Sequence, residues 1–265
     1  MFISSSSNPK IQRVRALLNQ RQARQEQRAF VVEGVRLIEE ALAARWEPEL
    51  ALYTDRLSER GLQMVDRFRE LKCEVAEVPD RLMDQITGTE TPQGLLAIFR
   101  QRDLPLPPAP DFLLIADNLR DPGNLGTLLR SAAAAGAQAA LLSPGTTEAY
   151  APKVLRAGMG AHFRLPIHHR GWEEIRALCK QRPPAPLTVY LADAAGGIPC
   201  WDLDLRAPLA LIVSSEADGP SPKARELADQ AITIPMPGVA ESLNAAVAAS
   251  ILLFEVVRQR RNANP

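Results

Sequence analysis

The sequence predicts a two-domain α/β protein, and three observations indicate this fold class. The chain has 265 residues, which exceeds one typical domain and allows a substantial core to be buried. Helix-like and strand-like segments alternate along the chain, as they do in α/β proteins. A proline-rich stretch over residues 104–110 divides the chain, and such stretches are extended and semi-rigid.

The first half, residues 1–102, has the pattern of a small α/β sandwich. It opens with a basic helix over residues 9–27. Further helices are expected over residues 34–45, 57–71 and 80–86, and strands over residues 30–32, 50–53, 74–78 and 95–99. A linker over residues 103–111 follows, and a second domain covers residues 112–265.

The second domain alone predicts a doubly wound parallel sheet. Strands are expected near residues 112–116, 139–142, 187–191, 209–213 and 231–234, and helices near residues 124–135, 150–157, 172–181, 222–228 and 242–260. The first of these strands runs into a polar, glycine-bearing loop, and the fourth runs into a small, acidic loop. Ligands bind at the carboxyl ends of parallel strands, so we expect these loops to converge on one crevice with the loop before the last helix.

The loop before the last helix, residues 234–244, is the most informative segment. It is bounded by proline and glycine and runs into small residues without a turn signal. Ser242 lies where a helix N-cap is expected, because a serine hydroxyl accepts a bond from a backbone N–H two or three residues on. The alanine-rich start of the helix allows close approach to other backbone.

Together these segments resemble the signature blocks of the SpoU (TrmH-type) branch of the SPOUT RNA methyltransferases. The resemblance covers roughly residues 111–260, and the blocks occur in the family's order. In the first block, an asparagine is followed six positions later by an arginine. The residues that match the three blocks are Asn124 and Arg130, then Glu216, then Met236, Gly238, Ser242, Leu243 and Asn244.

The resemblance implies methyl transfer from S-adenosylmethionine to a ribose 2'-hydroxyl of RNA, with no metal. It implies a deep trefoil knot in the last third of the chain, against the general rarity of knots, and a homodimer that completes each active site. It assigns Arg130 to activation of the hydroxyl, although a guanidinium is a poor base and is better suited to holding a phosphate and a developing alkoxide. The other catalytic residues are Asn124, Glu216, Ser242 and Asn244, and the cofactor-binding residues are Ser214, Ile234, Met236, Gly238 and Leu243.

The second block departs from the family pattern, because Ser214 and Ala217 stand where glycine is usual. Glycine permits positive φ and close backbone approach, so larger residues there would narrow a cofactor slot. This departure motivates an alternative, a non-catalytic RNA-binding protein of the same fold. The presence of the five catalytic matches together favours the enzyme, since a pure binding protein has no need of that set.

The first domain carries features of an RNA-binding domain. Residues 30–34 and residues 91–94 resemble the ribosomal L30e-like substrate-binding domain that precedes many SpoU catalytic domains. The net charge of the chain is zero, but basic residues crowd the first thirty positions, and phosphate binding depends on such local clusters. A solvated helix face is the alternative interpretation. The residues expected to contact RNA are Lys10, Arg13, Arg15, Arg21 and Arg24.

Other function classes lack their motifs. A nicotinamide dehydrogenase needs a Gly-x-Gly-x-x-Gly turn, and a serine hydrolase needs Gly-x-Ser-x-Gly; neither occurs. The three cysteines are widely spaced, which favours a reducing compartment, and we expect a cytoplasmic protein with no membrane span. Because an N-terminal domain of this kind is commoner among ribosomal RNA modifiers, 23S ribosomal RNA is favoured as substrate over transfer RNA.

Overall fold

The computed structural model describes residues 1–87, 93–181, 186–216, 218–239 and 242–263. The chain divides into two compact units. Unit 1 comprises Met1–Arg102 and Tyr150–Phe163, and unit 2 comprises Asp103–Ala149 and Arg164–Pro265. Residues 150–163 therefore belong with the first unit, although they fall inside the range expected for the second domain. The other limits expected for the two domains and the linker remain predictions.

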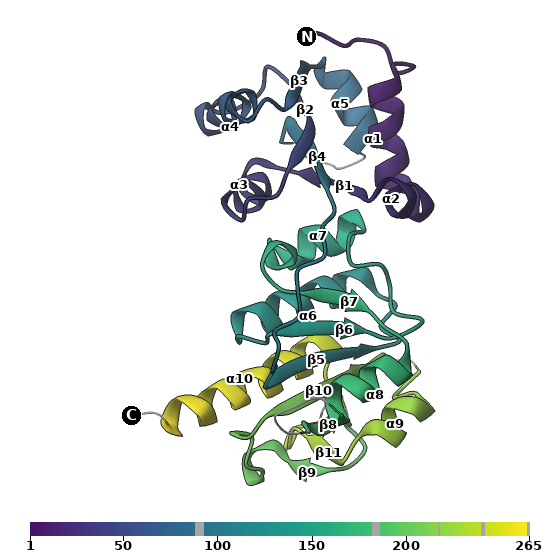
Figure 1. Ribbon diagram of the computed structural model, residues 1–265, viewed down its shortest axis with the longest axis vertical. Coiled ribbons are helices and arrows are strands. Elements are labelled where there is room, and N and C mark those ends of the chain that lie inside the picture. The colour runs from purple at the N-terminus through teal and green to yellow at the C-terminus, as the bar shows by residue number, and fades with distance from the viewer. Residues whose placement is uncertain (88–92, 182–185, 217, 240–241, 264–265) are drawn as a thin grey trace. The chain divides into compact units, whose positions relative to one another are not determined.

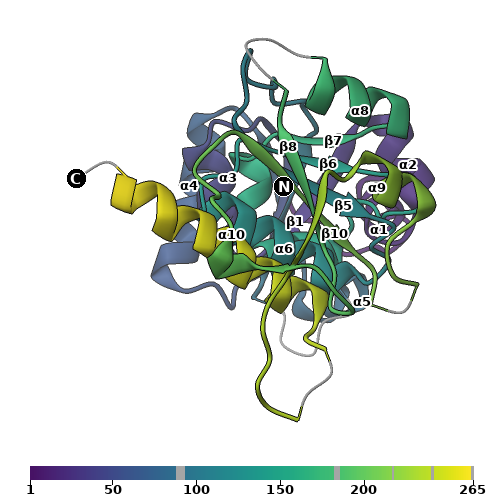
Figure 2. The same ribbon diagram turned by 90° about the horizontal axis from the view of Figure 1, so that it is seen from below.

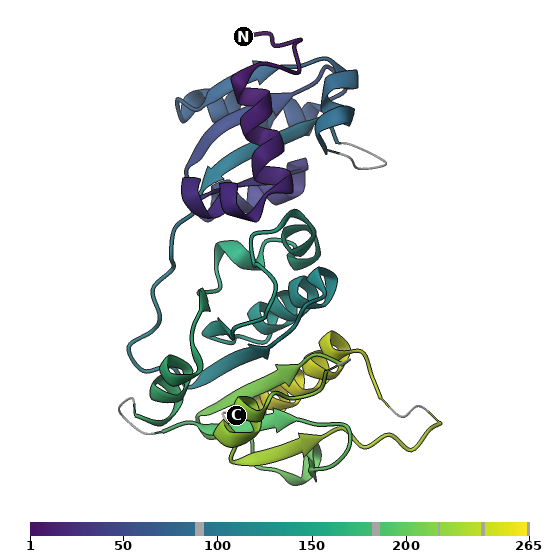
Figure 3. The same cartoon turned by 90° about the vertical axis from the view of Figure 1, so that its right-hand side faces the viewer.

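Unit 1 is built on a mixed four-stranded sheet (Figure 1). In spatial order its strands are β1 (Ala29–Glu33), β4 (Leu95–Arg100), β2 (Pro48–Tyr53) and β3 (Glu74–Glu77). One face is covered by α1 (Pro9–Asn19), α2 (Arg21–Gln27) and α5 (Asp80–Thr87), which share a core with that face. Figure 3 shows α1 in purple lying across this face. The other face carries α3 (Val35–Ala43) and α4 (Glu59–Glu70).

The predicted basic helix over residues 9–27 is two helices, because the chain is extended at Gln20, where φ is −121°. Arg24 explains how the break is stabilised. Its guanidinium donates to the carbonyls of Leu17 at 2.5 Å and Leu18 at 3.2 Å, which are among the last carbonyls of α1 and have no partner within that helix. Arg24 is only 5% exposed, so its predicted role as an RNA contact is corrected to a structural one.

The two pieces that resemble the L30e-like domain meet in unit 1. Gly34 has φ of +94°, and a Cβ atom there would lie 2.7 Å from Oε1 of Gln93. That oxygen accepts a hydrogen bond from the backbone N–H of Val35 at 3.2 Å, at the start of α3. Glycine is therefore required at position 34 by both its backbone conformation and the close approach of Gln93. Thr91 and Pro92 lie outside the described residues.

The segment that joins unit 1 from later in the chain contains α7 (Pro152–Gly158) and η1 (Ala161–Phe163). Tyr150 and Phe163 pack against Phe30 and Trp46, with ring centroids 4.8 to 6.4 Å apart. The indole N–H of Trp46 also donates to the carbonyl of Phe163 at 3.1 Å. Aromatic burial of this kind stabilises a core strongly, which explains why the segment belongs to this unit.

Unit 2 contains a seven-stranded sheet in which every pair is parallel, as the sequence predicted. In spatial order the strands are β7 (Ile167–His169), β6 (Ala139–Leu142), β5 (Phe112–Asp117), β10 (Leu209–Ser214), β8 (Thr188–Ala192), β11 (Gln230–Thr233) and β9 (Ile198–Pro199). The edge strands β7 and β9 were not predicted, because three and two residues give no readable alternation.

Helices cover both faces of this sheet (Figure 2). One face is covered by α8 (Trp172–Lys180) and α9 (Pro222–Leu227), and the other by α6 (Pro122–Ala134) and α10 (Ala245–Ala263). The hydroxyls of Ser131 and Ser250 lie 2.7 Å apart where α6 and α10 pack together. The proline-rich stretch is docked on this unit, since Leu106 packs against the core and Leu104 accepts a bond from His168. Within the described residues, no helix is long and apolar enough to cross a bilayer.

Candidate active site

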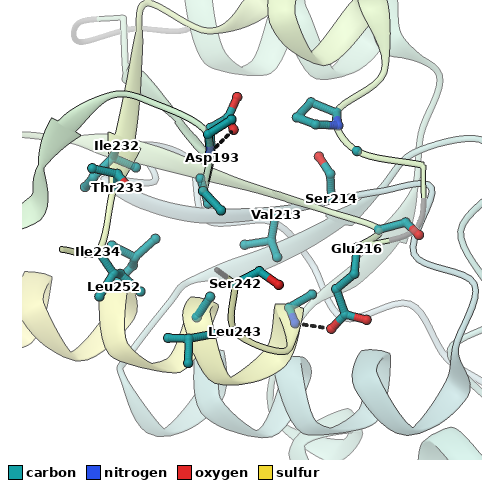
Figure 4. A pocket seen from close by; sticks show the side chains of 18 of the residues that line it. Asp193, Val213, Ser214, Glu216, Ile232, Thr233, Ile234, Ser242, Leu243 and Leu252 are labelled. Carbon is teal, nitrogen blue, oxygen red and sulfur yellow. Dashed lines mark hydrogen bonds between the residues drawn. The ribbon is translucent and has the colours of Figure 1, made fainter. Parts of the chain in front are cut away.

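A pocket of about 250 Å³ lies in unit 2 at the carboxyl ends of three adjacent strands, β8, β10 and β11 (Figure 4). This is where ligands bind in open parallel sheets. The start of α10 closes the fourth side. The apolar lining of the pocket includes Ala192, Val213, Ile232, Ile234, Met236, Leu243, Ala248 and Leu252. The polar lining of the pocket includes Asp193, Ser214, Ser215, Glu216, Thr233 and Ser242.

The structure brings most of the predicted cofactor-binding residues to this pocket. Ser214 ends β10, and Ile234 follows β11 directly, while Met236 and Leu243 come from the loop before α10. Two of the predicted catalytic residues, Glu216 and Ser242, line the same pocket. Gly238 is not among the lining residues. Of the three loops expected to converge, the loop after β10 and the loop before α10 line the pocket, whereas the loop after β5 supplies none of the lining residues.

A polar network joins all three predicted blocks. Asn124, in the first turn of α6, donates from Nδ2 to Oε1 of Glu216 at 3.5 Å. Asn244 donates from Nδ2 to Oδ1 of Asn124 at 2.9 Å. Glu216 also accepts a hydrogen bond from the backbone N–H of Ala245, the first residue of α10, which is drawn as a dashed line in Figure 4. A carboxylate at a helix N-terminus is favoured by the helix dipole.

The N-cap of α10 is Asn244 and not Ser242, which corrects the sequence interpretation. The side-chain oxygen of Asn244 accepts from the backbone N–H groups of Ala246 at 3.0 Å and Val247 at 3.3 Å. The helix begins at Ala245, three residues after the predicted start. Both serine and asparagine are good N-caps, so residue type alone did not separate the two positions.

Arg130 lies away from the pocket. It is exposed on α6, makes no ion pair within the described part of the chain and is not among the pocket residues. It also lies six positions from Asn124, about 240° around the helix at 3.6 residues per turn. The fold of this chain therefore does not bring Arg130 to the pocket that holds Glu216.

Asp193 is a pocket residue that sequence reasoning missed. It follows β8 directly, and its Oδ1 accepts from the backbone N–H of Ala195 at 2.9 Å, while Oδ2 lies 3.3 Å from Nη1 of Arg225. Its carboxylate fixes the turn that forms one wall of the pocket. The available signal was an acidic residue immediately after a predicted strand, the same signal that drew attention to the loop after β10.

The basic residues expected to bind RNA differ in their surroundings. Lys10 pairs with Glu74, and Arg13 pairs with Glu49 at 2.5 Å. Burial raises the pKa of Glu49, but hydrogen bonds from Arg13 and Arg100 outweigh burial and hold that pKa below its ordinary value. Arg15 and Arg21 make no ion pair among the described residues, which leaves their charge available to a phosphate.

None of the cysteines is set up as a nucleophile. Burial raises the pKa of Cys73 and that of Cys179 to about 12, and it also raises the pKa of Cys200. A thiol with such a pKa is protonated at neutral pH and reacts slowly. The described residues also contain no group of His, Cys, Asp or Glu that could hold a metal ion.

Comparison with known proteins decides the family. Residues 111–254 match the model of the SpoU rRNA methylase family. The chain belongs to the SpoU rRNA methylase family. Residues 8–97 of this SpoU-family chain match the MRM3-like substrate-binding domain, in agreement with the predicted substrate-binding function of the first domain.

Relatives of the SpoU-family chain align with it over nearly its whole length. It is 35% identical to rRNA methyltransferase 3, mitochondrial, of Mus musculus, covering 94% of this chain and 72% of the relative. It is 32% identical to the 23S rRNA (guanosine(2553)-2'-O)-methyltransferase RlmP of Bacillus subtilis, covering 96% and 98% of the two chains. The SpoU methyltransferase AviRb of Streptomyces viridochromogenes in complex with AdoMet superimposes with a TM-score of 0.87 at 30% identity, covering 96% and 98%.

These findings confirm several sequence predictions for the SpoU-family chain. The fold is an α/β SPOUT fold with a parallel sheet, preceded by a substrate-binding domain. The chain is an RNA methyltransferase, and its methyl donor is S-adenosylmethionine. The non-catalytic alternative is therefore set aside.

Proposed function

We propose that the protein is a cytoplasmic enzyme that methylates a ribose 2'-hydroxyl of 23S ribosomal RNA. The observation that carries this proposal is the network of Asn124, Glu216 and Asn244 beside the pocket at the carboxyl ends of β8, β10 and β11. Support for the substrate comes from relatives in Bacillus subtilis and Streptomyces viridochromogenes that are named as 23S rRNA 2'-O-methyltransferases.

The pocket residues fit S-adenosylmethionine. The small apolar side chains of Ala192, Val213 and Ile232 suit an adenosyl group, and the carboxylates of Asp193 and Glu216 place negative charge at the pocket wall. When bound, the donor supplies a methyl group on a positively charged sulfur, which these carboxylates complement. We assign the adenosyl group to the backbone of Ser214, Ile234, Met236 and Leu243, with Gly238 in the same loop as the last two.

The side chains beside the pocket orient the acceptor. In-line methyl transfer requires the hydroxyl oxygen to be aligned with the methyl carbon, and alignment alone contributes about 7 to 11 kcal/mol in favourable cases. We assign Asn124, Asn244 and Ser242 to the ribose, and Glu216 to holding the start of α10 in place through its bond to Ala245. Arg130 is assigned to the phosphate beside the ribose and to the developing alkoxide.

We propose that the enzyme is a homodimer in which Arg130 of one subunit acts at the pocket of its partner. Support comes from α10, where Val247, Ile251 and Phe254 are 47%, 38% and 48% exposed. Their spacing of four and three residues places them on one stripe of the helix. Arg130 is exposed on α6, the helix that packs beside α10, so it lies on the element next to the stripe that a partner would cover. The trefoil knot remains part of this proposal.

The RNA surface of unit 1 is proposed to include Arg15 and Arg21, with Lys10 and Arg13 beside them on α1. Arg24 is excluded because it is buried. These side chains would contact phosphates, and sequence recognition would then depend on other contacts.

The experiment that tests the proposal is methyl transfer from labelled S-adenosylmethionine to purified 23S ribosomal RNA, followed by digestion to nucleosides. The expected product is a single 2'-O-methylated nucleoside. Transfer RNA and 16S ribosomal RNA serve as matched controls and should remain unlabelled. Label on a base, or label only on transfer RNA, would contradict the proposal.

A further inference from the structure

Asp117 is a buried carboxylate to which the proposed mechanism gives no role. It is the last residue of β5 and is only 1% exposed. Its Oδ2 accepts from the hydroxyl of Ser214 at 3.1 Å and from the backbone N–H of Ser221 at 2.8 Å. Its Oδ1 accepts from the hydroxyl of Ser143 at 3.4 Å. All three partners are neutral donors, so hydrogen bonds alone compensate the buried charge.

The two partners of Oδ2 are the two ends of one loop. Ser214 ends β10, and Ser221 is the N-cap of α9. Between them, Ser215, Glu216, Gly219 and Pro220 line the pocket. Oδ2 of Asp117 therefore holds the first and last residues of this loop together. The residues between them form the wall of the pocket next to α10.

Ser214 takes part in this arrangement through its side chain. It pairs in register with Asp117 on the neighbouring strand, and its hydroxyl donates to that carboxylate. A glycine at position 214 has no side-chain donor and would leave Oδ2 with Ser221 alone. The serine that stands where the family usually has glycine is thus accommodated by Asp117.

We propose that Asp117 is a positioning residue for the methyl-donor pocket, acting through Ser214 and Ser221 to hold the loop that carries Glu216. This inference rests on the proposed function of the pocket. The tip of the same loop also contacts the segment after β5. Asp218 accepts a hydrogen bond from Nδ2 of Asn118 at 3.2 Å and lies 3.4 Å from Nη2 of Arg120. The tip contacts are exposed and weakened by water and salt, whereas the contacts of Asp117 are buried.

Two variants test the hydrogen bond between the Ser214 hydroxyl and the Asp117 carboxylate, one at the acceptor and one at the donor. Asp117→Asn keeps the volume of the side chain but removes its charge and one of its two acceptor oxygens, so the hydrogen bonds that it still accepts lose the reinforcement of the carboxylate charge. Ser214→Ala removes only one donor and leaves the carboxylate bonded to Ser221. Because the two residues share a hydrogen bond that Asp117→Asn weakens, the effect of Ser214→Ala should be smaller in the Asp117→Asn background.

The matched control is Thr146→Val. Thr146 is buried in the same unit, and its hydroxyl donates to the carbonyl of Ala116 at 3.0 Å, one residue before Asp117. This variant loses that bond and the bond that the same hydroxyl accepts from the backbone N–H of Leu119 at 3.4 Å, but neither bond involves an end of the 214–221 loop. It therefore reports what general destabilisation of the unit does to donor binding.

The test measures the dissociation constant of S-adenosylmethionine by calorimetry and amide hydrogen exchange in peptides that cover residues 214–221. Asp117→Asn is expected to raise the dissociation constant by about tenfold or more, which corresponds to about 1.4 kcal/mol, and to speed exchange in these peptides selectively. Ser214→Ala is expected to do the same to a smaller extent, and Thr146→Val is expected to change neither quantity by more than about twofold.

Two results would overturn the proposal. The first is donor binding and loop exchange in both Asp117→Asn and Ser214→Ala that equal those of the unaltered protein. The second is that Thr146→Val loses as much donor affinity as the Asp117→Asn and Ser214→Ala variants do, when all these variants have the same melting temperature. If the unaltered protein fails to bind the donor, the proposed function fails instead, and exchange of the loop still decides whether Asp117 positions it. Should Asp117→Asn fail to fold, Ser214→Ala carries the test.

Discussion

Single side chains decide how the candidate site is assembled, and Asn244 serves two purposes. Its oxygen caps α10, and its Nδ2 donates to Asn124. Serine also caps helices but has no amide to reach Asn124, so two variants separate these purposes.

Asn244→Ala is expected to lose about 0.5 to 2 kcal/mol of stability together with turnover. Asn244→Ser is expected to keep most of the stability and still lose turnover, because the bond to Asn124 is absent. Thermal unfolding and methyl-transfer rates measured on the same samples check this prediction. Full activity of Asn244→Ser would show that Asn244 acts only as a cap.

Arg130 gives a second prediction at this scale. Arg130→Ala is expected to lower turnover by about 10² to 10³, the range found when one donor to a developing oxyanion is removed. Donor binding should be unchanged, since Arg130 lies outside the pocket, and the dimer should persist because the apolar stripe of α10 is left intact. Single-turnover methyl transfer and calorimetry make the measurement, and an equal loss of donor affinity or folding would give Arg130 a structural role.

At the scale of elements, α10 carries the pocket on one side and an exposed apolar stripe on another. Ile251→Asp is expected to shift the protein from dimer to monomer, because a carboxylate buried in an apolar interface is strongly unfavourable. Sedimentation velocity over a range of protein concentrations measures the shift. Leu62→Asp, at a residue that is 49% exposed on α4, is the matched control and should leave the oligomeric state unchanged.

The pair of helices α1 and α2 provides a prediction about RNA. The double variant Arg15→Ala/Arg21→Ala is expected to weaken RNA binding. If each arginine neutralises one phosphate, the slope of the logarithm of the binding constant against the logarithm of the salt concentration should also become shallower by about 1.4 to 1.8. Filter binding at several salt concentrations measures this slope. Arg67→Ala/Arg69→Ala on α4 removes the same charge from side chains already paired with Glu70 and Asp66, and an equal effect there would contradict the assignment.

Elements with a strong local signal could be predicted from the sequence, and those with none could not. The strand expected near residues 112–116 and the helix expected near residues 124–135 appear in the structure close to their predicted positions. The break at Gln20 was missed because Arg24 reads as one more charge on a basic helix, and only burial shows that it binds the carbonyls of α1. The strands β7 and β9 depend on their neighbours in the sheet and have little signal of their own.

At the scale of the whole molecule, the site depends on contacts between distant parts of the chain. Glu216 meets Asn124 across 92 positions, and Asn244 meets Asn124 across 120. The motifs predicted which residues belong to the site, but spacing along the chain does not say which atoms bond to each other. Asp117 and Asp193 were overlooked for the same reason, since their importance comes from the loops that they hold.

We propose that S-adenosylmethionine binds in the pocket at the carboxyl ends of β8, β10 and β11, and calorimetric titration is the direct test of this binding. Saturable binding at about one site per chain is expected for S-adenosylmethionine and for S-adenosylhomocysteine. Ala248→Phe, which fills the pocket from α10, should abolish binding of both. A folded protein that binds neither compound, or an Ala248→Phe variant that binds them as the unaltered protein does, would contradict the claim.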